Sequence, residues 1–233
     1  MNYGPKTVTN GLVFCVDAAD KNSYIGSGTT WTDVSGNGNN GTLTNGPTFN
    51  NSNNGSIVFD GTNDYINIPY NSIFNPSTNV SVSIWAKLTV SDSNIRNPIE
   101  LSASADELYW IFLRADLSPK RWGWGVRQSN NTYAETTSNA TNPSINTWYN
   151  LTLVANSSTG LVSLYINGTL DGSVAYNGTL KQNVSATLSI GSDPGATRRY
   201  WIGNISNAQI YNRALTASEI QQNYNATKSR FGL

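Results

Sequence analysis

The 233-residue chain contains no histidine, one cysteine and one methionine, and only 12% of its residues are charged. Without histidine it can form neither a Ser-His-Asp triad nor a Cys-His pair, and it cannot bind zinc through imidazole. A single cysteine, Cys15, excludes an internal disulfide and any metal site built from several cysteines. Its position beside Phe14 in an apolar segment predicts a buried structural thiol.

An excess of one charge and long apolar runs are also missing. The chain has 14 Lys and Arg against 14 Asp and Glu, without a basic cluster. We therefore expect neither nucleic acid nor an anionic membrane as a partner. No apolar run approaches the roughly 20 residues of a membrane span. Residues 1–6 lack the apolar core of a signal peptide, so we expect synthesis in a cytoplasm.

What the sequence does contain is asparagine and aromatic residues. It has 33 asparagines and is also rich in serine, threonine and glycine, a composition that alone would suggest disorder. Aromatic residues, however, make up 11% of the chain and include seven tryptophans. That is far too many for a disordered polar segment, so we expect a folded domain with a polar surface and an aromatic core.

Alternating apolar residues dominate the middle of the chain. Residues 80–88 place Val80, Val82, Ile84, Ala86 and Leu88 on one face, as in a half-buried strand. The same reading gives further strands at 11–17, 56–60, 64–68, 107–114, 121–127, 131–137, 148–154, 161–166, 170–176, 186–191 and 200–212. About twelve strands separated by turn residues predict an all-β protein, an antiparallel two-sheet sandwich.

Turn and capping motifs refine this prediction. Asn167-Gly168 between two apolar runs is a strong hairpin signal. Thr216-Ala217-Ser218-Glu219 is a capping box and predicts one short helix near the C-terminus. No linker divides the chain, so we predict an N-terminal arm at 1–10, a single domain at 11–226 and a C-terminal tail at 227–233. The asparagine-rich stretch 35–55 reads as a long polar loop.

The order of several motifs carries a family resemblance. The segment SGNGNNGTLTNGPTF at 35–49 is followed by FDGTNDY at 59–65, LYING at 164–168 and GNISNAQIYNRAL at 203–215. Taken in this order over residues 11–226, they resemble the laminin-G-like jelly-roll branch of the concanavalin A-like lectin/glucanase superfamily. The asparagine-rich segment is also similar to loops in structural proteins of tailed bacteriophages.

The resemblance implies a jelly-roll sandwich that is usually non-catalytic, often binds glycans and often holds calcium. It also implies a virion structural protein, either a capsid decoration or a tail-appended surface domain. Such a protein would contact capsid or tail proteins, assemble as a homo-oligomer, lie on the virion surface and adhere to cell-surface polysaccharide. The alternative is a free carbohydrate-binding lectin module without an assembly role.

Hydrolysis is not expected, although the superfamily includes glucanases. Those enzymes carry a Glu-x-Asp-x-x-Glu strand, whereas none of the four glutamates here has that spacing: Glu100, Glu107, Glu135 and Glu219. A glycosidase needs two carboxyl groups that face one bond across ~5–10 Å. Asp106 and Glu107 are adjacent, so in a strand they point to opposite faces.

Calcium is the one cofactor for which the sequence contains candidate ligands. Asp33-x-Ser35-x-Asn37-Gly38 has the oxygen ligands of the first half of a calcium loop, but Thr44 stands where an EF-hand has its glutamate. An Asx-turn loop explains the same residues. The resemblance adds Asp60 and Asp64 as candidate calcium ligands.

Sugar binding is expected where aromatic rings and polar groups share a face. In Trp122-Gly123-Trp124 the two indoles lie on one side of a strand and glycine leaves the other side bare. With Arg127 and Tyr133 they would form a glycan platform. The alternative places both tryptophans in the sandwich core.

A last candidate is the cationic and aromatic sequence Arg198-Arg199-Tyr200. Arginine and aromatic residues are enriched at protein interfaces. We therefore consider this segment a candidate interface, with a solvated loop as the alternative.

Overall fold

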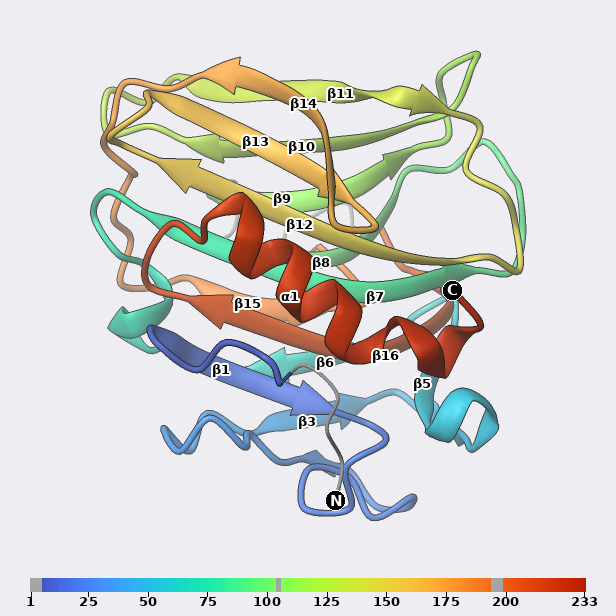
Figure 1. Cartoon of the computed structure of the whole chain (residues 1–233). Coiled ribbons are helices and arrows are strands. Elements are labelled where there is room, and N and C mark those ends of the chain that lie inside the picture. Colours follow the sequence, from blue (N-terminus) through green and yellow to red (C-terminus); the bar gives the residue numbers. More distant parts are fainter. Residues whose placement is uncertain (1–5, 104–105, 194–198) are drawn as a thin grey trace.

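The computed structural model describes residues 6–103, 106–193 and 199–233. The chain folds into two stacked sheets of eight strands each, in which every pairing is antiparallel (Figure 1). This confirms the all-β two-sheet sandwich with one C-terminal helix. Sheet A contains, in spatial order, β14 (Thr169–Ala175), β13 (Leu161–Ile166), β12 (Trp148–Asn156), β7 (Val80–Leu88), β16 (Ile202–Tyr211), β5 (Ser56–Asp60) and β4 (Thr48–Asn50), and β1 (Leu12–Asp17) also pairs with β16.

Sheet B lies behind sheet A in Figure 1. Its spatial order is β11 (Tyr133–Thr141), β10 (Arg121–Arg127), β9 (Asp106–Arg114), β8 (Arg96–Ala103), β15 (Thr187–Ile190), β6 (Tyr65–Ile68), β3 (Gly41–Thr44) and β2 (Thr30–Trp31). The single-turn helices are η1 (Ser52–Asn54), η2 (Ser72–Phe74) and η3 (Lys228–Phe231).

The core fills the space between the sheets, as alternation predicts. Val80, Val82, Ile84, Ala86 and Leu88 of β7 are all buried there. Because side chains of successive strand residues point to opposite faces, one apolar residue in two suffices to line this interior. The intervening positions, among them Ser81 and Ser83, point to the opposite face of sheet A.

Turn chemistry sets the pairing at one edge of the sandwich. Asn167 and Gly168 connect β13 to β14 with φ of 52° and 78°, as a two-residue hairpin requires. Further along β14, the Asp171 carboxylate accepts hydrogen bonds from the backbone N–H groups of Asn139 (2.8 Å) and Ala140 (2.9 Å) on β11. These bonds connect the edge strands of the two sheets.

Four strands were not predicted: β2, β3, β4 and β8. The stretch 35–55 is not one long loop, because it contributes β3 to sheet B, β4 to sheet A and the turn η1. These strands are two to four residues long and rich in threonine, so they have no measurable alternation. The fourth, β8, contains Pro98 and buried polar residues on its outer face.

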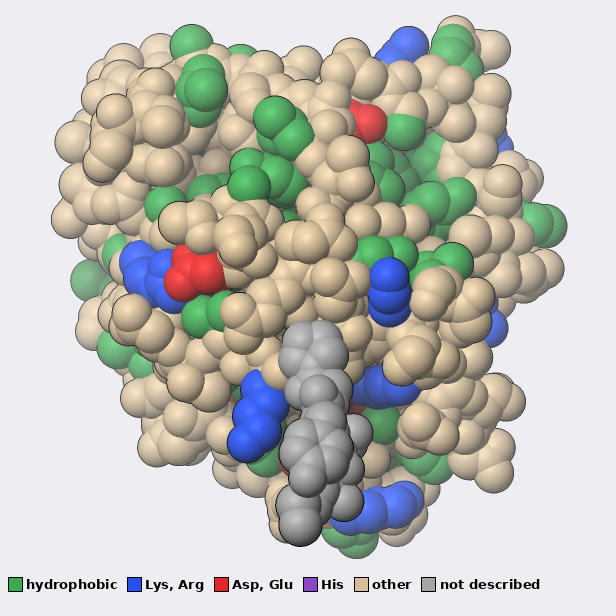
Figure 2. Space-filling model, viewed as in Figure 1, with side chains coloured by type: hydrophobic (Ala, Val, Ile, Leu, Met, Phe, Trp, Pro, Cys, Tyr) green, Lys and Arg blue, Asp and Glu red, His purple; other side chains and the backbone are tan. Residues whose placement is uncertain are grey.

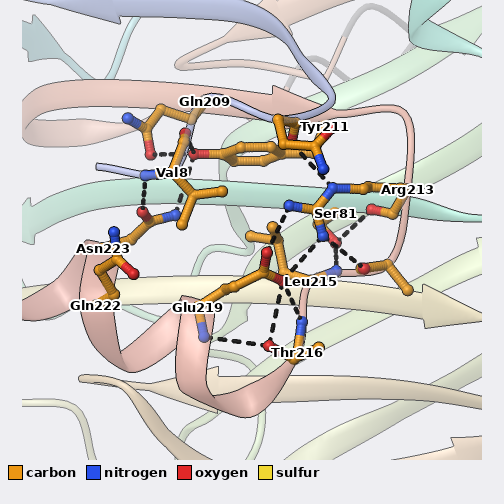
Figure 3. Close-up of polar contacts among 12 residues, drawn as sticks. Val8, Ser81, Gln209, Tyr211, Arg213, Leu215, Thr216, Glu219, Gln222 and Asn223 are labelled. Carbon is orange, nitrogen blue, oxygen red and sulfur yellow. Dashed lines mark hydrogen bonds and ion pairs between the residues drawn. The ribbon is translucent and has the colours of Figure 1, made fainter. Parts of the chain in front are cut away.

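The helix α1 (Ala217–Thr227) begins at the predicted capping box. The Thr216 hydroxyl accepts the Glu219 N–H, and Glu219 Oε2 accepts the Thr216 N–H at 2.9 Å (Figure 3). Arg213 clamps the same carboxylate with two bonds of 2.7 and 2.8 Å. The start of the helix is therefore stabilised both by its capping box and by an ion pair with Arg213, which follows the last strand.

Val8 near one end of the chain and Phe231 near the other pack against this helix or the sheet beneath it. In Figure 3 the Asn223 side chain bonds the N–H of Val8 (2.7 Å), a residue assigned to the arm, and the hydroxyl of Tyr211. Phe231, assigned to the tail, lies in η3 and stacks on Trp85 with ring centroids 4.1 Å apart. Trp85 is thus buried on the outer face of sheet A, under the C-terminal segment, rather than between the sheets.

The Arg213–Glu219 pair predicts a pH-dependent stability. Arg213 holds the pKa of Glu219 at about 2, below its ordinary 4.5. A lowered folded-state pKa stabilises the fold above pH 4.5, and this contribution disappears as the pH falls from about 4.5 to about 2. Glu219→Gln should therefore lower the free energy of unfolding by about 1–2 kcal/mol at pH 7 and much less at pH 2.5.

Urea unfolding at the two pH values measures this difference. Glu135→Gln on β11 is the control, because Glu135 is exposed and lies away from the helix cap. If Glu219→Gln lowered the free energy of unfolding equally at both pH values, the carboxylate charge would not be what stabilises the helix start.

The surface reflects the low charge content. On the face that carries α1, neutral polar side chains and backbone predominate, with scattered charged groups between them (Figure 2). Among the described residues, no helix has the length and apolar character needed to cross a membrane.

Candidate functional site

The structure corrects the predicted glycan platform. Trp122 and Trp124 are 1% and 0% exposed and point between the sheets. Trp122 stacks on Trp201 at a centroid distance of 6.2 Å, and the Trp124 ring lies against Gly172 of β14. The alternative, that both indoles belong to the core, is therefore the correct one. Because these rings are covered by sheet A, they offer no surface to a sugar.

The other two platform residues lie on the opposite face of the same sheet. Arg127 is three positions from Trp124, so strand alternation directs it outward. Its guanidinium carbon lies 5.2 Å from the centroid of the Tyr133 ring, and it also forms an ion pair with Asp106. Tyr133 is 42% exposed. The outer face of sheet B therefore holds two of the four predicted residues.

Two glycines make room for aromatic rings on this outer face. A Cβ at Gly123 would lie 2.5 Å from Phe112, and a Cβ at Gly125 would lie 2.6 Å from Trp110. Both distances are too short for real contacts, so these rings of β9 can lie across β10 only because the two positions are glycine. Trp110 also packs edge-on against Tyr133 at 5.6 Å. The aromatic rings of this outer face thus come from β9 and β11 rather than from the tryptophans of β10, and they are 1% (Trp110), 7% (Phe112) and 42% (Tyr133) exposed.

A pocket of about 280 Å³ opens on the outer face of sheet B. Its lining is Phe112, Arg114, Glu135, Thr136 and Thr137. Phe112 is 7% exposed and supplies the apolar part, whereas Arg114, Glu135 and Thr137 supply guanidinium, carboxylate and hydroxyl groups. Thr136 is the cross-strand partner of Trp124, so its side chain points to the other face of the sheet. The pocket therefore combines one aromatic ring with a polar rim.

A second pocket of about 590 Å³ adjoins the first. It is lined by Gly61, Ser93, Asn94, Ile95, Arg96, Asp116, Arg199 and Tyr200. The two pockets are linked by the ion pair of Arg114 with Asp116, two bonds of 2.8 Å, and by Arg199, which lies 5.9 Å from the Phe112 ring centroid. Hydrogen bonding to Arg114 lowers the pKa of Asp116, so this carboxylate is ionised at neutral pH.

Three carboxyl groups meet on the same outer face, next to Arg199. One oxygen from each of Glu100 (β8), Glu107 (β9) and Asp193 (after β15) lies within 4.8 Å of the others. Arg199 Nη1 is 3.3 Å from Glu107 and its Nε is 3.8 Å from Asp193. Burial, followed by the charges of Asp193 and Glu107, raises the pKa of Glu100 well above its ordinary value.

The predicted calcium ligands Asp33, Asp60 and Asp64 are not brought together. Within the described residues, the one group of three acidic side chains at ligand distance is the Glu100 cluster. Asp33 Oδ1 accepts the N–H groups of Cys15 and Ser35, and its Oδ2 accepts from Ser35 Oγ and Asn39 N, all at 2.9–3.0 Å. These four bonds occupy its acceptor sites, which is the arrangement of an Asx-turn loop.

Asp60 and Asp64 hold a turn instead of a metal. Asp64 Oδ2 accepts the Asp60 N–H at 3.0 Å, and Asp60 Oδ1 accepts the Thr62 N–H at 2.7 Å. Burial raises the pKa of Asp64, which weakens its use as an anionic ligand. The donor set predicted from the sequence therefore does not fit a calcium ion.

The interface candidates have mixed outcomes. Arg198 lies outside the described residues. Arg199 and Tyr200 are half-buried and line the larger pocket. Arg199 is thus held by Glu107 and Asp193 rather than free in a solvated loop. Whether Arg199 and Tyr200 contact another protein stays a prediction.

Sequence reasoning missed Trp110, Phe112 and Glu100. The alternation of residues 107–114 places Trp110 and Phe112 on the face opposite Tyr109 and Ile111, and this signal was available together with the bare glycine face of β10. For Glu100 no signal existed, because its strand was not predicted.

Comparison with known proteins assigns the family. The sequence profile described as "Concanavalin A-like lectin/glucanases superfamily" matches residues 60–221, more than half of the chain. The chain belongs to the concanavalin A-like lectin/glucanases superfamily. Among curated proteins, none matches it.

This superfamily member is similar in fold to solved structures of toxin domains. The ligand-binding domain of botulinum neurotoxin serotype D in complex with N-acetylneuraminic acid is 19% identical with a TM-score of 0.70, covering 93% of this chain and 51% of that one. The binding domain of Paraclostridial Mosquitocidal Protein 1 is 19% identical with a TM-score of 0.71, covering 93% and 52%. The chain thus spans about half the length of these structures, and the likeness shows the fold.

Proposed function

We propose that this concanavalin A-like domain is a non-catalytic glycan-binding module that uses the 280 Å³ pocket on the outer face of sheet B. The observation that carries the proposal is the Phe112 ring at the pocket, surrounded by polar groups from β9 and β11. Sugars present apolar C–H faces and polar edges, so an aromatic ring with hydroxyl and carboxylate neighbours matches both. The toxin domain solved with N-acetylneuraminic acid, about half of which is similar in fold to this chain, is a sugar-binding protein and supports the proposal to that extent.

The shape of the site favours binding over hydrolysis. Glu100 and Asp193 are 0% and 2% exposed, and Arg199 bonds the third carboxylate of their cluster. A glycosidase must place two carboxyl groups against the sugar itself. Carboxyl groups buried in this way lack access to a glycosidic bond, whereas the exposed Glu135 has no second carboxylate lining its pocket.

Neutral sugars fit this pocket better than strongly anionic ones. Of its two charged groups, Arg114 is already paired with Asp116, and Glu135 would repel an acidic sugar. The remaining polar side chain is Thr137 of β11. We therefore infer a neutral hexopyranose as the ligand class. The virion role, the homo-oligomer and the virion-surface location, which rest on the bacteriophage resemblance alone, stay predictions.

Glycan-array screening followed by calorimetry tests the proposal. Phe112→Ala should weaken binding of a glycan identified on the array at least tenfold, because the sugar loses its aromatic contact. Gly123→Ala should also weaken binding although Gly123 itself does not line the pocket, since a new Cβ would push the Phe112 ring out of place.

Matched threonines provide the control. Thr137→Val removes a hydroxyl from the pocket, and Thr169→Val removes one from an exposed position of β14 on sheet A. Only the first should reduce affinity. Circular dichroism establishes that each variant is folded. Absence of binding to any glycan, or binding unchanged in both Phe112→Ala and Thr137→Val, would overturn the proposal.

A further inference from the structure

The glycan pocket, the 280 Å³ pocket lined by Phe112, has a larger neighbour. The two pockets have volumes of about 280 and 590 Å³. Sites that bind small molecules typically measure ~300–1,000 Å³, so the glycan pocket alone lies at the lower end of that range. A ligand confined to it would be a single small unit, and room for a longer ligand lies directly beside it.

The larger pocket combines apolar and neutral polar groups, as the glycan pocket does. Its apolar part comes from Ile95 and Tyr200, which are both half-buried. Ser93 and Asn94 are exposed and supply a hydroxyl and an amide. Such a set matches the C–H faces and hydroxyl edges of a sugar. The larger pocket therefore has the chemistry of a second sugar subsite.

Tyr200 is the aromatic residue of this second subsite. The next residue, Trp201, is fully buried in the core. The Tyr200 side chain is only half-buried and, among the described residues, is not one of those that pack against the core. Phe112 and Tyr200 thus place one aromatic residue in each of the two pockets.

The charged groups of the larger pocket are held in ion pairs. Three pairs are formed: Arg96 with Asp92, Arg199 with Glu107 and Asp116 with Arg114. Arg96 also donates to the carbonyl oxygen of Tyr200 at 2.8 Å, so it fixes the backbone of the aromatic residue. Because each of these charges has a partner of opposite sign, the pocket gives an acidic sugar no electrostatic advantage over a neutral one.

The two pockets border on each other at one of these ion pairs. Arg114 lines the glycan pocket and Asp116 the larger one, and their side chains are 32% and 36% exposed. Each Asp116 carboxylate oxygen accepts one bond of 2.8 Å from Arg114. An ionised carboxylate has about four acceptor positions, so Asp116 can also accept from sugar hydroxyl groups. A sugar chain that crosses from one pocket to the other would therefore meet a hydrogen-bonding group at the boundary.

We propose that the ligand is a neutral oligosaccharide that occupies both pockets, with one pyranose unit at Phe112, another at Tyr200 and the chain between them over the Arg114–Asp116 pair. The inference rests on the proposed glycan-binding function and extends its ligand from a single hexose to a chain. The second unit is tethered to the first, so it binds without a second loss of translational freedom. Affinity should therefore rise steeply with the length of the ligand.

Calorimetry with sugars of increasing length tests the inference on the full chain. The probes are glucose, galactose and mannose and the neutral homo-oligosaccharides of each. In a series that binds, affinity should rise at least tenfold from the monosaccharide to the longer members and stay constant once both pockets are filled. A monosaccharide that binds as tightly as the longest member would overturn the inference and leave the proposed function intact. Absence of binding to any glycan would overturn both.

Two variants assign the subsites. Tyr200→Ala should weaken binding of the longer oligosaccharides at least tenfold and leave monosaccharide binding unchanged, because the second unit loses its aromatic contact. Phe112→Ala should weaken binding of both. Equal losses for monosaccharide and oligosaccharide in Tyr200→Ala would show that Tyr200 acts only through the fold, and would overturn its assignment to a subsite.

Tyr133→Ala is the matched control. It removes the same kind of side chain from the outer face of sheet B, but Tyr133 lines neither pocket, so binding at every length should be unchanged. Asn94→Ala keeps the test decisive if Tyr200→Ala fails to fold. Asn94 is exposed, so its truncation leaves no cavity, and it should selectively weaken binding of the longer oligosaccharides severalfold. An unaltered length dependence in Asn94→Ala and in folded Tyr200→Ala would overturn the second subsite.

Discussion

Replacing Trp124 with alanine should lower the free energy of unfolding by about 3–5 kcal/mol. The indole is fully buried between the sheets, and its ring fits against Gly172 of the edge strand β14, where a Cβ would lie 3.0 Å from the ring. Removing it leaves a cavity at the place where β10 and β14 approach each other. Because neither strand can collapse without breaking its own sheet pairing, the cavity persists.

Urea unfolding followed by circular dichroism measures the effect, with the slope against denaturant checked for constancy. Tyr133→Ala is the comparison, because it also removes a large ring from sheet B but from a side chain that is 42% exposed. Tyr133→Ala should lower the free energy of unfolding by less than about 1 kcal/mol. A Trp124→Ala protein of normal stability that no longer binds glycan would restore the original platform hypothesis.

Replacing Gly203 with alanine should be at least as destabilising. We expect the free energy of unfolding to fall by about 3 kcal/mol or more and little of the variant to be folded. Gly203 in β16 has φ of +138°, and a Cβ there would lie 2.1 Å from the carbonyl oxygen of Lys87 in β7. Both strands lie in the middle of sheet A, so neither backbone can move without disrupting its other neighbour. The substitution therefore combines backbone strain with a clash that cannot relax.

Gly38→Ala separates the two causes. Gly38 also has positive φ, at +74°, but no atom lies within 4 Å of its would-be Cβ. The Gly38→Ala substitution should lower the free energy of unfolding by only about 1 kcal/mol, which is the cost of the backbone conformation itself. Thermal unfolding of both variants gives the comparison. Similar losses in the two would show that the approach of β16 to β7 is looser than the structure indicates.

Local signals in the sequence predicted local structure well. Asn167-Gly168 and the capping box of Thr216 and Glu219 act over a few residues, so their outcome depends little on the rest of the chain. Alternation likewise showed that Trp122 and Trp124 share a face. It did not show which face is covered, because that depends on where sheet A lies. The prediction of an exposed platform was wrong for this reason.

The sequence by itself determined the class of fold, the family and the chemistry that is excluded by the absence of histidine and of paired cysteines. Only the tertiary structure decided which residues lie together on the candidate functional face. The site groups of β8 and β9 are close in sequence, but those of β11 and of the segment after β15 are distant from them and become their neighbours through sheet pairing. Glu100 is the clearest example. It is a buried carboxylate in a strand that was not predicted, and only the fold shows that Glu107 and Asp193 lie beside it.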